Sequence, residues 1–302
     1  MWDELGVPHK TAKQVFGNHL TILGIDMDVN ALTFTLPEEA KVWLEQELKI
    51  WSQKGVQHKV KEWQQVAGWL NWALNVYPLL WPALNNVYLK IKGKGQEVWV
   101  WANKAIKEDL QWAKQEIMQS DGVLLLKSLS WDVDQATCLL KTDVCPNGIA
   151  FWYPALGLAF SASTPKGTLP DQIIFYESLS VLPSLLDAHH RFSVSGKIII
   201  YTDNFTTVAM FNSLQALFEY NCIIKEAVDI LLDGDHDLYV LHISGKSNDV
   251  ADTLSQFEFM RALSLQPDLT IFPFKPFTRV ERQQLLRHSF YFYFYFEHLN
   301  FT

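Results

Sequence analysis

In the N-terminal part of the chain, the spacing of apolar residues predicts one β-hairpin followed by helices. Residues 20–27 alternate between apolar and polar side chains, turn at 28–30, and continue into a second strand at 31–36. Four later segments carry apolar side chains at helical spacing, and the first opens with Pro37 and two glutamates, which favour a helix start. These segments are residues 37–51, 60–73, 78–91 and 104–118. Together they predict a small helical domain.

The pattern changes after residue 122, where short β-rich segments alternate with helical ones. Three strands are predicted first, then a helix, a strongly apolar strand, two helices, a further strand and a last helix. In chain order these segments are residues 136–143, 148–154, 156–163, 171–189, 197–202, 206–217, 219–232, 238–243 and 249–257. This order predicts an α/β domain in which helices flank a mixed sheet.

The composition is typical of a folded protein of two domains. The chain has 302 residues, of which 49% are hydrophobic and 19% are charged. Its longest apolar stretch, residues 70–89, is interrupted by asparagines and prolines, so no membrane span is expected. The acidic N-terminus lacks the apolar core of a signal peptide. Cys138, Cys145 and Cys222 show no close C-x-x-C pairing. We therefore expect an intracellular protein, cytoplasmic or nuclear and not secreted, with free thiols.

The charge balance neither requires nor excludes a nucleic-acid partner. The formal net charge is −8, whereas phosphate contacts need clustered lysine or arginine side chains. A local basic surface can exist on an acidic protein, and five lysines in or near the third and fourth predicted helices are candidates for it. They are Lys90, Lys92, Lys94, Lys104 and Lys107. A solvated helix face explains the same lysines equally well.

Four acidic residues in the α/β part occupy positions that suggest a metal site. Asp143 ends the first strand and Asp203 ends the fourth, while Glu177 and Asp252 lie in helices. Ligands usually bind at the carboxyl ends of strands in an open α/β sheet, and clustered carboxylates need protons or cations to be stable together. Hard oxygen ligands select Mg²⁺ or Mn²⁺, and two such ions can drive phosphodiester cleavage. The competing interpretation treats each acid as a turn former or a helix cap.

Local motifs around these four acids resemble the RNase H domains of retroelement polyproteins. The segment 141–152 reads KTDVCPNGIAFW and is similar to their first strand and turn, and 174–179 reads IFYESL, like their first helix. The segment 200–204 reads IYTDN, and 242–255 reads HISGKSNDVADTLS, which is the most specific of the four. Their order and spacing resemble the reverse transcriptases of DIRS-like and gypsy-like retrotransposons.

The resemblance extends upstream and implies four parts of the chain. The segment 16–28, FGNHLTILGIDMD, resembles the last palm hairpin of these polymerases, and 64–73, QQVAGWLNWA, resembles their thumb helix. The implied parts are a palm remnant (1–36), a helical thumb and connection (37–121), an RNase H-like domain (122–260) and a C-terminal extension (261–302). The RNase H-like domain would contain a five-stranded mixed sheet. In residues 288–296 of the extension, phenylalanine and tyrosine alternate without a recognisable motif. We expect the extension to be disordered or to add an edge strand to the sheet.

The resemblance implies metal-dependent hydrolysis of the RNA strand in RNA/DNA hybrids. The four acids would hold two Mg²⁺ ions, for which Mn²⁺ is a substitute, and the register of the last motif favours Asp252 over Asp249. His242 matches a histidine that assists proton transfer or product release; taken alone, it would be a strand-end histidine with a structural hydrogen bond. Asn204 and Asn248 fall inside the same motifs and are candidates for nucleic-acid contact. The rest of a retroelement polymerase is a candidate partner.

Departures from the family pattern support a rival interpretation. Val144 and Cys145 replace an Ala-Ser pair after the first aspartate, and Gln256 stands where the family usually has arginine. The fingers, most of the palm and the Tyr-x-Asp-Asp polymerase motif are not found in this sequence, so we expect no polymerase activity. The rival is a catalytically inactive, decayed or domesticated nucleic-acid-binding module of RNase H fold. An integrase core is a third alternative, although integrases typically use three carboxylates.

Overall fold

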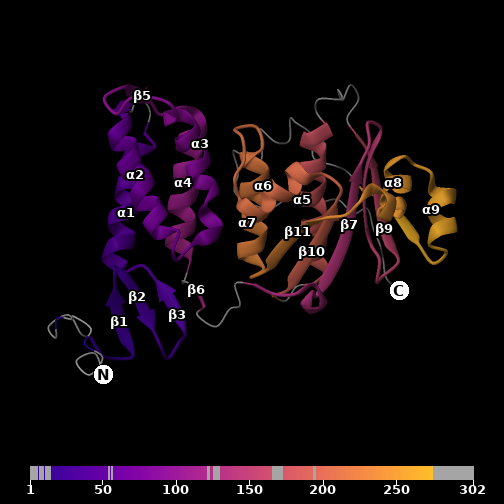
Figure 1. Cartoon of the computed structure of the whole chain (residues 1–302), viewed down its shortest axis with the longest axis horizontal. Coiled ribbons are helices and arrows are strands. Elements are labelled where there is room, and N and C mark those ends of the chain that lie inside the picture. The colour runs from indigo at the N-terminus through magenta and orange to yellow at the C-terminus, as the bar shows by residue number, and fades with distance from the viewer. Residues whose placement is uncertain are drawn as a thin grey trace. The chain divides into compact units, whose positions relative to one another are not determined.

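The structure, a computed structural model, divides the chain into two compact units. They are Met1–Ser130, called unit 1, and Trp131–Thr302, called unit 2. The structure describes residues 15–120, 123–124, 130–164, 173–192 and 195–274, apart from 54 and 56, together with residues 6 and 10. Each unit has its own sheet and its own buried core (Figure 1).

Unit 1 contains a four-stranded antiparallel sheet in the order β1-β2-β3-β6. Its strands are β1 His19–Ile22, β2 Ile25–Asp28, β3 Thr33–Thr35 and β6 Val123–Leu124. The prediction of a single strand across residues 20–27 was wrong, because the chain reverses at Leu23 and Gly24. Both residues have positive φ, 53° and 77°, and such a two-residue turn matches the right-handed twist of paired strands. Trp72 Nε1 donates to the Leu23 carbonyl oxygen at 3.1 Å and ties this turn to a helix.

Four helices make up most of unit 1, as the spacing of apolar residues predicts. They are α1 Glu38–Trp51, α2 Val60–Ala73, α3 Pro82–Ile91 and α4 Lys104–Gln119. The third begins later than predicted, because Pro78–Leu80 form a separate 3₁₀ turn in front of it. Inward-facing side chains such as Leu44, Leu84 and Leu110 are fully buried and form the core between the helices. Two short strands, β4 Gln57–Lys59 and β5 Trp99–Trp101, pair antiparallel.

Unit 2 contains a six-stranded mixed sheet in the order β11-β10-β7-β8-β9-β12. Its strands are β7 Cys138–Val144, β8 Gly148–Tyr153, β9 Leu158–Ser163, β10 Lys197–Thr202, β11 Asp237–His242 and β12 Thr270–Pro273. β7, β8 and β9 form an antiparallel meander, whereas β10 runs parallel to both β7 and β11. The five strands predicted from the sequence are confirmed, and β12 adds a sixth that is parallel to β9.

Helices cover both faces of this sheet (Figure 1). They are α5 Ile173–Arg191, α6 Phe205–Ser213, α7 Asn221–Asp233, α8 Asp249–Ser255 and α9 Phe259–Leu265. Successive side chains of a strand point to opposite faces. Trp152 of β8 clusters with Ala251 and Leu254 of α8, whereas the next residue, Tyr153, donates a hydrogen bond to Asp187 of α5. α5 and α8 therefore pack against opposite faces, as expected for an RNase H-like α+β domain. None of the helices in the described ranges is long and apolar enough to span a lipid bilayer.

The predicted boundary at residue 260 does not mark the end of the ordered fold. Phe272 of β12 lies opposite Phe160 of β9, with ring centroids 5.6 Å apart, and Leu269 joins the apolar cluster under α8. Residues 261–274 are therefore part of the sheet and its cover, because their apolar side chains meet a matching surface at the sheet edge. The aromatic run at 288–296 lies outside the described residues.

Candidate active site

Asp143 and Asp203 lie at the same rim of the unit 2 sheet. β7 and β10 are parallel neighbours with Lys141 opposite Tyr201, and each aspartate comes two residues after this pair. Asp143 is still within its strand and is buried, whereas Asp203 follows its strand directly and is exposed. The carboxyl ends of two adjacent strands therefore bring both carboxylates to the place where open α/β sheets usually bind ligands.

Glu177 reaches the same rim from α5. Its side chain is buried, and Thr202 Oγ1, at the end of β10, donates to its Oε2 at 3.5 Å. Burial raises the pKa of Glu177 well above its usual value, and the nearby charges of Asp143 and Asp203 raise it further. The third predicted acid is thus electrostatically coupled to the first two.

Asp252 and its helix complete the group. Ser255, one turn further along α8, donates from Oγ to Asp143 Oδ2 at 2.6 Å, which fixes α8 to the end of β7. The loop before α8 also approaches the site, since a Cβ placed on Gly245 would lie 3.6 Å from Asp203 Oδ2. Gln256 Nε2 donates to Asp252 Oδ1, so this carboxylate is held by a neutral side chain.

The pKa of Asp143 reflects its burial and the charges of the other acids. Burial raises its pKa to about 6, the Ser255 hydroxyl opposes this shift, and the charges of Asp203 and Asp252 add to it. An ordinary aspartate has a pKa near 4. The structure therefore brings together all four acids that the sequence analysis selected, because Asp143 interacts with each of the others.

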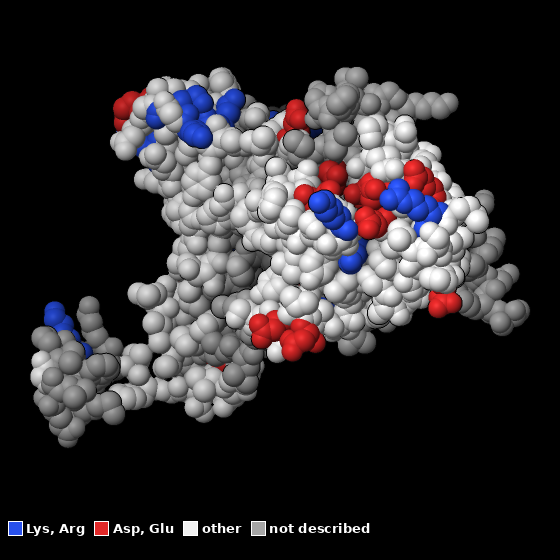
Figure 2. Space-filling model, turned by 45° about the vertical axis from the view of Figure 1, so that its right-hand side comes forward, with Lys and Arg blue, Asp and Glu red and all other residues white. Residues whose placement is uncertain are grey.

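The carboxylate oxygens of the four acids are suitable ligands for Mg²⁺, but they are too far apart to form a coordination shell. Carboxylate oxygens are the ligands that this cation prefers, and Figure 2 shows acidic side chains collected on one face of unit 2 with basic side chains beside them. Within the described ranges, no three His, Cys, Asp or Glu side chains are close enough to hold a metal ion. Mutual repulsion keeps uncompensated carboxylates apart, and Asp252 is engaged by Gln256.

His242 stands beside this rim at the end of β11. It lies opposite Thr202 of β10, and its imidazole stacks on the ring of Phe205 with centroids 3.7 Å apart and an interplanar angle of 8°. Both side chains are exposed. Sequence reasoning selected His242 and missed Phe205, although an aromatic residue two positions after Asp203, at the start of a helix, was a usable signal.

The two asparagines of the motifs have structural partners. Asn204 caps α6, since its Oδ1 accepts from the Thr207 amide at 2.9 Å. Asn248 is buried and donates from Nδ2 to the Thr142 carbonyl oxygen at 2.9 Å, next to Asp143. Its Oδ1 is buried without a hydrogen-bond partner in the part of the chain that the structure describes. Both residues therefore position the acidic rim.

The five candidate lysines lie elsewhere, in unit 1. Lys90 is in the last turn of α3, and Lys92 and Lys94 follow it in an exposed loop. Lys104 begins α4 and pairs with Glu108 at 3.5 Å. Lys107 is half-buried in the same helix. Three of these lysines thus lie at and after the end of α3, and two lie in the first turns of α4.

A local hydrogen bond compensates for the departure from the family pattern at Cys145. Cys145 stands in place of the usual serine, and its Sγ donates to the Ser255 carbonyl oxygen at 3.1 Å. Val144 is buried at the end of β7. The substituted residues therefore leave Asp143 and α8 joined.

No family model matches this sequence, and no curated protein sequence matches it at a significant level. Two solved structures of the foamy viral protease-reverse transcriptase resemble the chain weakly. The complex with RNA/DNA hybrid is 10% identical, with a TM-score of 0.32, and the match covers 80% of this chain and 52% of that chain. The complex with dsDNA is 13% identical, with a TM-score of 0.29, and the match covers 87% of this chain and 46% of that chain. The chain thus spans about half the length of these structures.

Proposed function

We propose that unit 2 hydrolyses the RNA strand of RNA/DNA hybrids, with divalent cations bound among its four acids. The observation that supports this most directly is the environment of Asp143, which is buried and lies within electrostatic reach of Glu177, Asp203 and Asp252. Such an arrangement is unfavourable unless a proton or a cation offsets the repulsion. A rim that gathers these groups at the ends of two strands suits cation-dependent phosphodiester chemistry.

The chain's own residues would set the position of each carboxylate. Asp143 is held by Ser255, and Glu177 is held by Thr202. Asp203, which is exposed, would be the acid nearest to the substrate backbone. Mg²⁺ ions bound there would activate the attacking water and stabilise the leaving oxygen. Selection of the RNA strand would require contacts to its 2′-hydroxyl groups in the minor groove.

His242 is the proposed proton carrier. Its place beside Thr202 puts it on the same edge as Asp203. The stacked ring of Phe205 would restrain the plane of the imidazole, so that a ring nitrogen can give a proton to the leaving 3′-oxygen. Histidine is the side chain that most often serves as a general acid or base in enzymes.

The test is cleavage of an RNA/DNA hybrid labelled on each strand, with Mg²⁺ or Mn²⁺. We expect cleavage of the RNA strand only, leaving a 3′-hydroxyl and a 5′-phosphate. Asp143→Asn and Asp203→Asn should each reduce the rate at least about a hundredfold, because even indirect partners of metal ligands contribute ten- to hundredfold. Asp249→Asn is the matched control, since Asp249 is exposed, one turn from Asp252, and outside the proposed ligand set.

Two structural observations favour a second function. The hydrogen bond from Gln256 to Asp252 and the open spacing of the acids suit an inactive module that binds nucleic acid without cutting it. If protein with a native circular dichroism spectrum binds the hybrid and fails to cleave it with either metal, that result would favour the inactive binding module over the nuclease. Cleavage that persists in Asp143→Asn would also reject the proposed site.

A further inference from the structure

The ribbon formed by β4 and β5 exposes two tryptophans on its outer face. Trp99 and Trp101 are each 55% exposed, whereas Val100 between them is buried. The antiparallel register places Lys59 opposite Trp99 and Gln57 opposite Trp101, so these four side chains share one face. Two exposed indoles on adjacent outward positions are unusual, because a tryptophan buries more apolar surface than any other residue when it is packed.

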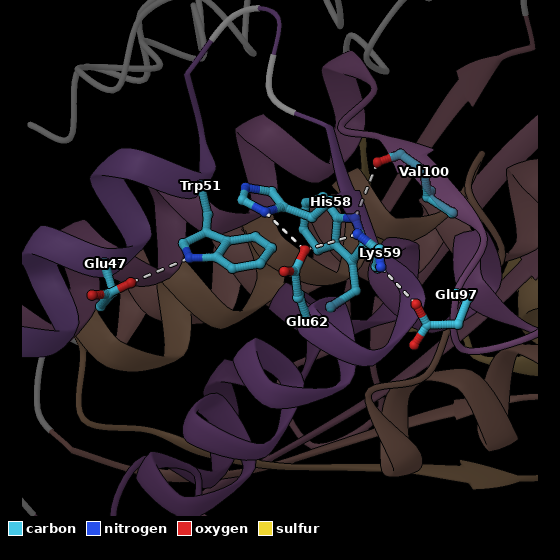
Figure 3. A network of polar contacts seen from close by, with 8 residues as sticks. Glu47, Trp51, His58, Lys59, Glu62, Glu97 and Val100 are labelled. Carbon is cyan, nitrogen blue, oxygen red and sulfur yellow. Dashed lines mark hydrogen bonds and ion pairs between the residues drawn. The ribbon is translucent and has the colours of Figure 1, made fainter.

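The inner face of the ribbon already has its partners. His58 stacks on Trp51 with ring centroids 3.7 Å apart, and Trp63 Nε1 donates to the Val100 carbonyl oxygen at 3.2 Å. Glu62 Oε2 accepts from the Lys59 amide at 2.9 Å (Figure 3). The ribbon is therefore fastened to α1 and α2 through its inner face. Its outer face presents two aromatic rings that are each more than half exposed.

Positive charge lies beside these rings. Lys59 Nζ is 5.7 Å from the centroid of the Trp99 ring and binds Glu97 at 2.6 Å (Figure 3). Lys61 binds the same carboxylate at 2.8 Å. The loop that leads into β5 adds Lys92 and Lys94, which are exposed and form no ion pair within the described residues. Lysines thus outnumber the glutamates here, and Figure 2 shows lysines gathered at the end of unit 1 where β5 lies in Figure 1.

The spacing of the rings suits an extended polyanion with planar groups. Residues two apart in a strand are about 6.6 Å apart, which is too far for one base pair step of about 3.4 Å and is suited to bases that are spread along a single strand. Base stacking on exposed aromatic side chains, with lysines along the backbone, is the general mode of single-strand binding. A protein partner is less well supported than a nucleic acid, because the outer face of the ribbon has no aliphatic side chain.

We propose that the outer face of β4 and β5 binds single-stranded nucleic acid, with successive bases stacked on Trp99 and Trp101 and phosphates near Lys59. The chemical class of the ligand is an unpaired stretch of DNA or RNA, read by stacking and charge rather than by sequence. This site goes beyond the proposed hydrolysis in unit 2 and does not depend on it.

The experiment measures the affinity of the full chain for fluorescent oligo(dT) and oligo(U) of about 16 nucleotides by anisotropy. Trp99→Leu and Trp101→Leu should each weaken binding about fivefold or more, whereas Trp99→Tyr should keep most of it, since a ring that stacks is retained. Trp43→Leu is the matched control, because Trp43 is 39% exposed in α1 and contacts Trp69. Lys59→Gln should reduce the dependence of the affinity on salt.

Three results would overturn the inference: no binding of either oligonucleotide, equal affinity of the Leu variants and the wild type, or equal losses in Trp43→Leu. Retained affinity in Trp99→Leu together with loss in Trp99→Tyr would also overturn it, because stacking on a ring requires the opposite order. Circular dichroism confirms that each variant is folded, which is expected because both rings are more than half exposed. Asp143→Asn separates the two proposals, because it should abolish hydrolysis and leave oligonucleotide binding unchanged.

Discussion

Gly148 shows how one residue connects the sheet of unit 2 to its acidic rim. It begins β8, and a Cβ placed on it would lie 2.1 Å from the Ser255 carbonyl oxygen. Ser255 is also the residue that donates to Asp143. The close approach of two backbones therefore requires glycine at this position, because a side chain would push α8 away from β7.

We therefore expect Gly148→Ala to lower the free energy of unfolding by about 2–3 kcal/mol. Gly68→Ala is the control, since Gly68 lies within α2 with nothing within 4 Å of an added Cβ. It should raise stability by about 0.5–1 kcal/mol through helix propensity. Urea unfolding followed by circular dichroism measures both, and an unchanged midpoint for Gly148→Ala would contradict the packing described here.

Cys138 illustrates how burial changes the pKa of a thiol. Burial raises its pKa to about 12, and the nearby charge of Asp187 adds to this shift. In the unfolded chain the pKa of a cysteine is about 8.5. Because the folded pKa is the higher one, the thiol's contribution to stability is complete below about pH 8.5. It is then lost as the pH rises toward the folded value.

Native protein at pH 8 should accordingly leave Cys138 unmodified by iodoacetamide, while the half-buried Cys145 reacts. Unfolding in urea should expose both thiols to the reagent. Peptide mass spectrometry after timed labelling measures each site separately. Modification of Cys138 in the native state at the rate of Cys145 would show that the start of β7 is not buried.

At the scale of elements, the buried carboxylate of Asp187 ties α5 to β8. Asp187 Oδ2 accepts from Tyr153 Oη at 2.6 Å and from Arg191 Nε at 2.6 Å, and Arg191 Nη2 donates to Oδ1 at 3.2 Å. The guanidinium also lies 5.2 Å from the Phe160 ring of β9. One carboxylate thus satisfies the Tyr153 hydroxyl, which would otherwise be buried without a partner, and also pairs with a guanidinium that is partly exposed.

Asp187→Ala should therefore cost about 1–3 kcal/mol, because it leaves the buried hydroxyl of Tyr153 without its partner. The guanidinium of Arg191 is partly exposed and can still reach water. Glu258→Ala is a control that also breaks an arginine pair. Its partner is Arg261, at 3.0 Å, and both side chains are exposed, so the loss should stay below about 1 kcal/mol. Similar losses in thermal unfolding of the two variants would refute the special role of Asp187.

The predicted elements of both units follow local signals, and the one wrong strand shows where such signals fail. Alternation across residues 20–27 indicates strand on both sides of Leu23, but Leu23 is not a typical residue for positive φ. It adopts this conformation where its carbonyl meets Trp72. The turn therefore depends on a contact between residues far apart in the chain, which no local pattern can reveal.

At the scale of the whole molecule, each unit is built around a core of its own. The apolar cluster of unit 2 joins Trp152 and Ala159 of the sheet to Leu254 of α8 and Leu269 after α9. All members of this cluster come from residues beyond 131. A domain of this size with a closed core can fold alone.

We expect the fragment 131–302 to fold without unit 1 and to unfold within about 5 °C of the same transition in the full chain. A fragment that starts at residue 146 lacks β7, which lies inside the sheet between β10 and β8, and should not fold. Circular dichroism and calorimetry compare the two. A disordered 131–302 fragment would show that unit 2 needs the rest of the chain.

The sequence by itself indicated the four helices of unit 1, the first five strands of the unit 2 sheet with the helices α5 to α8, and the four acids of the candidate site. Hydrophobic periodicity is a local property, and the motifs around the acids are short stretches that can be recognised one at a time. Tertiary structure alone decided that Ser255 meets Asp143, that Phe205 stacks on His242, and that β12 completes the sheet. It also placed Trp99 and Trp101 on an unoccupied face. These contacts join residues whose separation along the chain carries no periodic signal, so only packing in three dimensions selects them.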